Sequence, residues 1–296
     1  MQALLVKTLP RVPRRIVARV ASRYVAGAEV IAALTTAQRL SDEGATTTLA
    51  LLGEEVADRA AASEATAAYL QLLTELKQRA LPCNVSVKLT HIGLDIDRDF
   101  CIENLTRLGA HAQSLGGFVR LDMEDHTRTD VTLDAYRTVQ QRHPVFGVVL
   151  QAMLRRTLDD IAALPEGTNV RLCKGIYREP EEIAFVRHSE VRQKFVEALE
   201  ALFDRQCFVG IASHDRWVVE RARALITARK LTARDYEFQM LLGVLPKMRQ
   251  RLLEEGHAVR VYIPYGEDWY AYSMRRLREN PTVALHVIRA FLTPWR

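Results

Sequence analysis

The sequence contains no hydrophobic run long enough to cross a membrane as a helix, because none reaches the roughly 18 residues that such a span requires. No GxGxxG segment follows a first predicted strand, which excludes a dinucleotide-binding half of the Rossmann type. Only four cysteines occur in 296 residues, and their spacing does not suit a metal site, so we interpret them as reduced, buried thiols of a cytosolic protein. The chain also lacks internal repeats and linkers rich in proline, glycine or serine, which favours a single domain.

Acidic residues are absent before Glu29, although that stretch contains the basic residues Lys7, Arg11, Arg14, Arg15, Arg19 and Arg23. An arginine-rich amphipathic segment of this kind can be a targeting peptide or a helix on a membrane surface. A helix that packs on the folded domain is the alternative that we prefer. The whole chain, with 48% hydrophobic and 26% charged residues, has the composition of a globular enzyme. Basic and aromatic residues do not alternate in a stripe, so no nucleic-acid partner is expected.

From residue 46 onward, segments typical of strands alternate with segments typical of helices. Strands are expected at 46–52, 84–89, 118–123, 145–150, 170–174, 208–213, 236–240 and 258–263. Helices are expected at 64–80, 98–114, 133–142, 158–164, 181–205, 216–228 and 245–254, with one more after the last strand. Eight strand–helix units with short connections predict a parallel sheet that closes into a (β/α)8 barrel of the TIM type. We therefore expect a helical arm over residues 1–44, with a break near Ala26 and Gly27, and a barrel catalytic domain over 45–296.

Polar side chains follow most of the predicted strands, and in this fold the active site lies at the carboxyl ends of the strands. The candidates at these ends are Lys88, Thr90, His91, Asp122, Glu124, Asp125, Gln151, Arg171, Lys174, Tyr177, Ser213, His214, Asp215, Tyr262 and Tyr265. Lysine and arginine rarely lie inside a strand unless they are paired or reach a ligand. Lys88, Arg120, Arg171 and Arg260 could each form an ion pair within the barrel. Several cationic groups at one rim are better explained together by an anionic ligand, such as a carboxylate or a phosphate.

The segment RVYIPYGEDWYAYSMRRL, near the end of the chain, is predicted to be a strand, a turn and a helix. Pro264 is expected to end the strand. On the helix that follows, Tyr272, Arg275 and Arg276 lie within about one turn of each other. Two adjacent arginines that face one pocket suit a carboxylate, because each guanidinium offers a planar fork of donors. A solvated helix face is the alternative for any arginine pair, and the strand–turn–helix context favours the binding site.

Five motifs, in order along the chain, resemble those of one known family. VRLCKGIYREP, at 170–180, is similar to the segment after the fifth strand of proline dehydrogenases, in which alanine usually stands at the place of Ile176. The same family is matched by SVKLTHIG, RLDMED, ASHD and YIPYGEDWYAYSMRRL. RYVAGAE resembles its N-terminal motif but has alanine where an acidic residue usually follows Gly27. The resemblance therefore covers nearly the whole chain.

The resemblance implies a flavoenzyme on a distorted (β/α)8 barrel, which oxidises L-proline to Δ1-pyrroline-5-carboxylate by hydride transfer to FAD in the first step of proline catabolism to glutamate. No further catalytic segment follows the barrel, so we expect the monofunctional form, with a separate pyrroline-5-carboxylate dehydrogenase downstream. A quinone-type electron acceptor is expected to reoxidise the flavin. We expect a cytoplasmic location, with peripheral contact between the N-terminal arm and the inner face of the membrane as a further hypothesis.

The same resemblance assigns roles to residues. Asp122 and Arg171 would be catalytic, with Asp122 orienting the lysine and the pocket and Arg171 near the flavin atom that receives the hydride. The substrate would be held by Lys88, Tyr262, Tyr272, Arg275 and Arg276. FAD would contact Met123, Gln151, Arg171, Lys174, Gly175, Ile176, Ser213 and His214. No metal is implied.

Two other functions remain open on sequence grounds. Histidines and carboxylates at the rim, among them His91, Glu124 and His214, would suit zinc or manganese in a barrel hydrolase. However, no HxH follows the first strand, and the excess of lysine and arginine would oppose a cation. A barrel that merely binds an anionic ligand or a protein partner would leave the cationic and aromatic rim without chemistry to perform. A yellow colour in the purified protein would exclude both alternatives.

Overall fold

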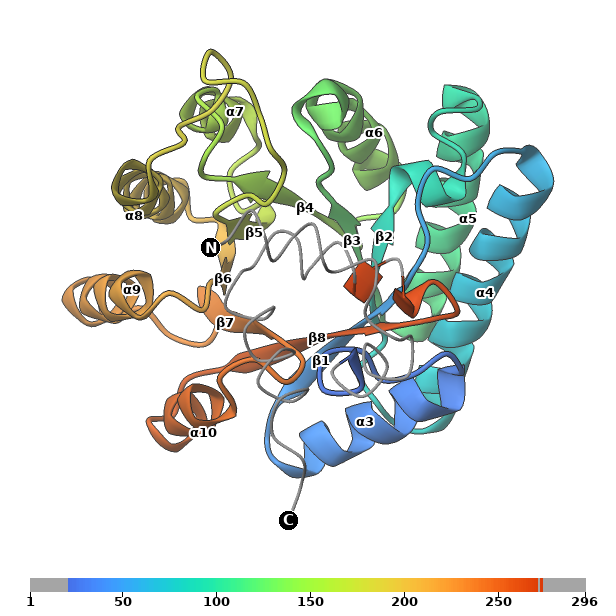
Figure 1. The fold of residues 1–296 in the computed structure, drawn as a ribbon, viewed down its shortest axis with the longest axis horizontal. Coiled ribbons are helices and arrows are strands. Elements are labelled where there is room, and N and C mark those ends of the chain that lie inside the picture. Colours follow the sequence, from blue (N-terminus) through green and yellow to red (C-terminus); the bar gives the residue numbers. More distant parts are fainter. Residues whose placement is uncertain (1–20, 271, 274–296) are drawn as a thin grey trace, which may run out of the picture.

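Eight parallel strands, β1 to β8, form a closed barrel in which each strand pairs with the next and β8 pairs with β1 (Figure 1). The computed structural model describes residues 21–270 and 272–273. The strands are β1 (Thr46–Leu51), β2 (Asn84–Lys88), β3 (Phe118–Asp122), β4 (Phe146–Gln151), β5 (Asn169–Cys173), β6 (Phe208–Ala212), β7 (Tyr236–Leu241) and β8 (Val259–Tyr265). The predicted (β/α)8 barrel is confirmed.

Helices surround the strands on the outside of the barrel (Figure 1). They are α3 (Val30–Asp42), α4 (Arg59–Gln78), α5 (Arg98–Leu115), α6 (Thr129–Arg142), α7 (Thr157–Ala163), α8 (His188–Asp204), α9 (Arg216–Arg229) and α10 (Pro246–Glu254), with short 3-10 helices η2 (Leu89–Ile92) and η3 (His126–Arg128). Aspartates begin three of them: the side chains of Asp58, Asp97 and Asp215 accept hydrogen bonds from the first backbone N–H groups of α4, α5 and α9.

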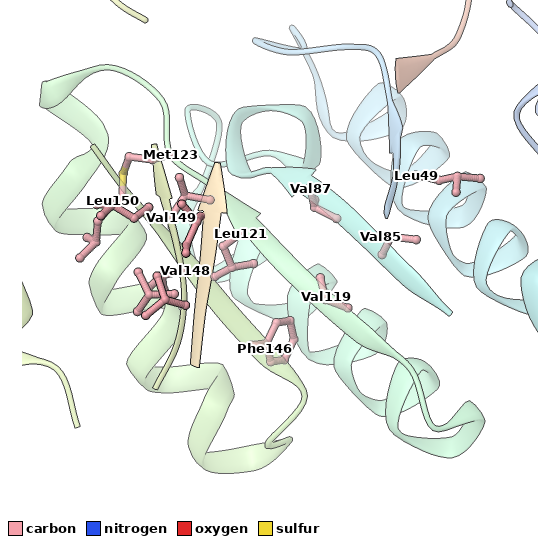
Figure 2. Close-up of a cluster of buried hydrophobic side chains, with 14 of the residues drawn as sticks. Leu49, Val85, Val87, Val119, Leu121, Met123, Phe146, Val148, Val149 and Leu150 are labelled. Carbon is pink, nitrogen blue, oxygen red and sulfur yellow. The ribbon is translucent and has the colours of Figure 1, made fainter. Parts of the chain in front are cut away.

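The apolar core lies between the strands and the helices, because alternate residues of each strand point outward. Val85 and Val87 on β2 and Val119 and Leu121 on β3 belong to this buried layer (Figure 2). The alternate positions point into the barrel and are largely polar. On β3, for example, the inward residues include Arg120, which is 3% exposed. The interior of a (β/α)8 barrel is usually filled by branched apolar side chains. The interior of this barrel differs, because polar side chains fill most of it.

Helix α3 packs against β1 and β8, and its apolar residues share the core of the barrel. The break predicted near Ala26 and Gly27 is present, because α3 begins only at Val30. The backbone N–H of Ala26 donates to the carbonyl of Pro264 at 2.9 Å, and the carbonyl of Gly27 accepts from Gly266 at 2.9 Å. Residues 1–20 lie outside the described part of the chain, so the division at residues 44 and 45 stays a prediction.

Pro264 does not end β8, contrary to the sequence-based expectation. The strand continues to Tyr265, and Pro264 pairs with Ala50 of β1. Pairing between β8 and β7 stops at Tyr262. The proline therefore lies where β8 has a strand on one side only, and its missing N–H is tolerated there.

The helix predicted at 181–205 is wrong at its start, because α8 begins at His188. The preceding residues pair instead with the loop after β4. Ile183 accepts a backbone hydrogen bond from Arg155 at 2.9 Å, and Phe185 donates one to Met153 at 2.8 Å. These contacts between distant segments outweigh the local helical tendency of the acidic residues. No helix in the described part of the chain has the length and apolar character needed to span a membrane.

Candidate active site

Asp122 and Arg171 form an ion pair inside the carboxyl end of the barrel. Nη1 of Arg171 lies 2.7 Å from Oδ1 of Asp122, and both side chains are largely buried. The same carboxylate oxygen accepts a hydrogen bond from the hydroxyl of Ser86 at 2.6 Å. Its second oxygen accepts from the hydroxyl of Tyr262 at 3.0 Å. Asp122 therefore organises side chains from β2, β5 and β8.

Tyr262 contacts both members of this pair. Cζ of Arg171 is 5.2 Å from the centre of the Tyr262 ring, which allows a cation–π contact. Burial, reinforced by the charge of Asp122, raises the pKa of Tyr262 well above its usual value. The phenol therefore stays protonated at neutral pH and remains a hydrogen-bond donor to Asp122.

Lys88 ends β2 and stands beside Asp122 in the register of β2 and β3. Its ammonium makes no hydrogen bond or ion pair with another described residue, in contrast to Arg171. The sequence predicted both as cationic rim groups, and among the described residues only Arg171 has an ion pair.

Arg120, which is buried, and Arg260, which is partly buried, are engaged within the barrel and do not add to the rim. Arg120 donates to the carbonyls of Val148 and Asn169 at 2.9 and 2.8 Å and also to the side chain of Asn169. Arg260 pairs with Glu237 at 2.7 Å. An ion pair inside the barrel is thus present for Arg260, as it is for Arg171 with Asp122, whereas Arg120 is held by neutral acceptors.

Gln239 and Glu237, both on β7, were not identified as site residues from the sequence. Oε1 of Gln239 accepts from Nε of Arg171 at 2.5 Å, and Nε2 of Gln239 donates to Glu237 at 2.7 Å. The sequence does indicate that both side chains lie inside the barrel, because polar and apolar residues alternate in YEFQM. What the sequence did not show is their contact with Arg171.

A second charged cluster lies at the ends of β5 and β6. Lys174 pairs with Asp215, and Arg192 of α8 binds the same carboxylate through Nε and Nη2 at 2.7 and 2.9 Å. Burial alone would raise the pKa of Asp215, but the hydrogen bonds from Arg192 and Lys174 hold it well below its usual range. His188 lies 3.4 Å from the ammonium of Lys174, and burial with the two nearby cations lowers its pKa. Arg192 was not predicted, since it lies on a helix and not at a strand end.

The remaining predicted cofactor residues occupy the same end of the barrel. Gln151 is buried at the end of β4 and donates to the carbonyl of Glu124 at 2.9 Å. His214 accepts from the backbone N–H of Leu241 at 2.9 Å, and Ser213 accepts from that of Asp215 at 3.2 Å.

Three further predicted cofactor residues follow β3 and β5. Met123 belongs to the buried core (Figure 2). It is 7% exposed, whereas Ile176 is 38% exposed. Between Lys174 and Ile176, Gly175 adopts a φ of 104°, which favours glycine.

Glu124 and His214, two residues of the metal alternative, form hydrogen bonds with Thr90 and Leu241. Glu124 accepts from the backbone and hydroxyl of Thr90 at 3.2 and 2.7 Å, and burial raises its pKa in spite of these bonds. Burial, helped by the charge of Lys88, lowers the pKa of His91 to about 4, so this ring is neutral. Among the residues that the structure describes, no group of three or more His, Cys, Asp or Glu could hold a metal ion.

Of the predicted substrate residues on the last helix, only Tyr272 is described. Its side chain is 8% exposed and packs with Val25, Leu52 and the partly buried Trp269. Arg275 and Arg276 lie outside the described residues.

Comparison with known proteins shows the family of this chain. The sequence profile of the proline dehydrogenase family matches residues 33–288. A proline dehydrogenase of Deinococcus radiodurans is 35% identical over 278 residues, covering 92% of this chain and 90% of that protein. Proline dehydrogenase 2 of Bacillus subtilis is 34% identical over 263 residues, covering 88% and 87%.

Solved structures show the same fold. Proline utilization A from Bdellovibrio bacteriovorus, inactivated by N-propargylglycine, superposes with a TM-score of 0.82 at 25% identity over 88% of this chain. The protein from Corynebacterium freiburgense gives a TM-score of 0.77 at 23% identity over 97%. This chain spans about a third of each of those chains, 32% and 34%. By its sequence over nearly the whole length, the chain belongs to the proline dehydrogenase family, the enzymes that oxidise L-proline to Δ1-pyrroline-5-carboxylate.

Proposed function

We propose that this family member uses FAD as its hydride acceptor and binds both L-proline and FAD at the carboxyl end of the barrel. The observation that carries the proposal is the buried pair of Asp122 and Arg171 with Tyr262 at that end. Burying two charges is expensive, and such a pair adds little to stability by itself. Its position where barrel enzymes bind ligands gives it a chemical role.

The side chains at the ends of β5 and β6 fit FAD by their chemistry. Lys174 and Arg192 share the single carboxylate of Asp215, so cations exceed carboxylates in this cluster. Such an excess suits a pyrophosphate group. The contacts with FAD are assigned to Met123, Gln151, Arg171, Lys174, Gly175, Ile176, Ser213 and His214. The side chain of Ile176, which replaces the alanine usual in the family, is exposed.

FAD, when bound, supplies the acceptor for the hydride that leaves the carbon beside the proline nitrogen. Arg171 provides a fixed positive charge at this end of the barrel, where negative charge develops during the reaction. Asp122 holds that guanidinium and also keeps the hydroxyl of Tyr262 in place. Because these groups are already hydrogen-bonded to each other, little reorganisation is needed when the substrate binds.

The substrate carboxylate is assigned to Lys88 together with Arg275 and Arg276. Lys88 has the required charge and has no ion pair with another described residue. The pyrrolidine ring is assigned to the space between Tyr262 and Tyr272. Holding a substrate in this way can lower a barrier by several kcal/mol, on the order of 7–11 at the extreme.

The wider setting is proposed as a quinone-type electron acceptor and a separate pyrroline-5-carboxylate dehydrogenase that consumes the product. The location is proposed as cytoplasmic, with the basic N-terminal arm touching the inner face of the membrane at about 1 kcal/mol per well-placed lysine or arginine. Co-sedimentation with anionic vesicles at low salt, with and without residues 1–20, tests the membrane contact. Binding that is absent, or unchanged by the deletion, contradicts it.

An absorbance spectrum tests the central proposal. The purified chain should be yellow, should release FAD on treatment with acid or heat, and should be bleached by L-proline under anaerobic conditions without a nicotinamide cofactor. A colourless protein that also fails to take up added FAD would end the proposal.

A further inference from the structure

A chain of hydrogen bonds runs through the barrel interior from Arg171 to β8. Arg171 donates through Nε to Gln239 at 2.5 Å, Gln239 donates to Glu237 at 2.7 Å, and Arg260 donates to the same oxygen of Glu237 at 2.7 Å. Arg260 is itself fixed by a bond to the carbonyl of Thr47 at 2.8 Å. Gln239 and Glu237 are 4% and 5% exposed, so water does not compete for these bonds.

The chemistry of its two neighbours fixes the orientation of the Gln239 amide. An arginine can only donate, so the amide oxygen must face Arg171. An ionised carboxylate can only accept, so the amide nitrogen must face Glu237. Only one of the two possible orientations of the Gln239 amide therefore satisfies both neighbours, and in it the amide oxygen accepts from Arg171. The opposite side of the guanidinium is held through Nη1 by Asp122 at 2.7 Å and by Ser86 at 3.1 Å.

Gly210 on β6 provides the space for this amide. It stands beside Arg171 on one side and Glu237 on the other in the strand register. A Cβ at this position would lie 2.3 Å from Nε2 and 2.7 Å from Cδ of Gln239. The amide could not then keep its hydrogen bonds with both Arg171 and Glu237. The absence of a side chain at Gly210 is therefore needed for these two bonds.

We propose that Gln239, with Glu237 and Gly210, is a positioning device that sets the orientation of the Arg171 guanidinium in the active site. Gln239 acts through Arg171 and touches neither substrate nor cofactor. The inference rests on the proposed function, because it takes Arg171 as the group beside the reacting atoms. By this proposal β7 contributes to the reaction through Gln239, although no residue at the carboxyl end of β7 was a candidate.

Two substitutions at position 239 separate positioning from packing. Gln239→Met keeps the length of the side chain but offers no acceptor to Arg171. Gln239→Glu keeps an acceptor for Arg171, whether it is ionised or protonated, and can donate to Glu237 only when it is protonated. We expect kcat/KM for proline, per FAD-loaded site, to fall about ten- to a hundred-fold with Met and only a few-fold with Glu.

The matched control lies in the same barrel. Asn169 accepts from Arg120 as Gln239 accepts from Arg171, but Arg120 is bound to backbone carbonyls and does not reach the rim. Asn169→Leu should lower the melting temperature and leave kcat/KM per loaded site near wild type. The midpoint potential of the bound flavin is the readout besides activity. It should become more negative in Gln239→Met, because a displaced positive charge stabilises the reduced flavin less, and stay unchanged in Asn169→Leu.

Gly210→Ala decides the question if Gln239→Met does not fold. It leaves Gln239 in the chain but displaces its amide, so kcat/KM and the flavin potential should both fall. The inference is overturned if Gln239→Met and Gly210→Ala match wild type in both measurements, or if Asn169→Leu lowers kcat/KM by the same factor. A wild-type chain that binds no FAD would instead contradict the proposed function, and the two failures are thereby distinguished.

Discussion

Arg171 and Asp122 lie on β5 and β3, which are not neighbours, yet their side chains meet at 2.7 Å inside the barrel. β4 stands between them and contributes Gly147 and Val149 to the inner face. The small residue leaves room for long side chains to cross the interior. A polar network can thus replace the branched apolar filling that is usual in such barrels.

Asp122→Asn should lower kcat/KM for proline by about ten- to a few-hundred-fold. The asparagine keeps the shape and one acceptor oxygen, but it leaves the buried charge of Arg171 without its counter-ion. Steady-state kinetics per FAD-loaded site provide the measurement. Asp134→Asn is the control, because its ion pair with Arg137 is exposed and should contribute little. If Asp122→Asn keeps wild-type kinetics, Asp122 is not a catalytic residue.

Gly175→Ala should weaken FAD binding. Its φ of 104° disfavours a side chain, and a Cβ there would lie 2.4 Å from Sδ of Met153, so the Met153 side chain or the backbone between Lys174 and Ile176 must move. Gly256→Ala is the matched control, since it has a φ of 83° and open space around the new Cβ. Both variants should lose about 1–2 kcal/mol of stability, but only Gly175→Ala should show a raised Kd in a fluorescence titration with FAD. Equal affinities would remove Gly175 from the cofactor site.

Arg276→Met should reduce kcat/KM for proline by about ten- to a few-hundred-fold, because a charge-assisted bidentate contact with the carboxylate is lost. FAD content should stay near wild type. Pyrrolidine lacks the carboxylate and should be a poor substrate for both enzymes, with no further loss in the variant. The measurement is this two-by-two comparison of enzyme and substrate. Equal slowing of proline and pyrrolidine means that Arg276 does not read the carboxylate.

The barrel was predictable because its signals are local. Alternating Val and Ile mark strands such as β2 and β8, and the aspartate caps mark the starts of helices. The strand ends then led to Asp122, Arg171 and Tyr262 without knowledge of their contacts. The family resemblance assigned their roles, which the order of strands alone could not do.

What failed depends on contacts between distant segments. Pro264 lies in a strand because β7 has already ended beside it, and the residues before α8 pair with the loop after β4. Gln239 meets Arg171 only because β6, between them, contributes Gly210. This contact depends on the register of β5, β6 and β7 and on the small size of residue 210. No local sequence pattern specifies both.

Asp215→Asn should lower the melting temperature at neutral pH by a few degrees. Asparagine still caps α9, where Asp215 accepts from the N–H of Trp217 at 3.0 Å, so the substitution removes the charge and one of the two acceptor oxygens that Lys174 and Arg192 share. In the folded chain the pKa of Asp215 lies well below the 3.8 of a free aspartate. Its stabilising effect is therefore complete above that value and is lost as the pH falls toward the folded pKa.

The difference in melting temperature between wild type and Asp215→Asn should then be constant from pH 7 to about 5 and shrink below about 4. Unfolding is followed at matched FAD content, since Lys174 belongs to the proposed cofactor site. Asp204→Asn breaks an exposed pair with Arg229 and should change little at any pH. A difference that persists unchanged at pH 3 would show that the carboxylate charge is not its source, since protonation of Asp215 in the unfolded chain should by then have reduced the stability that the charge contributes.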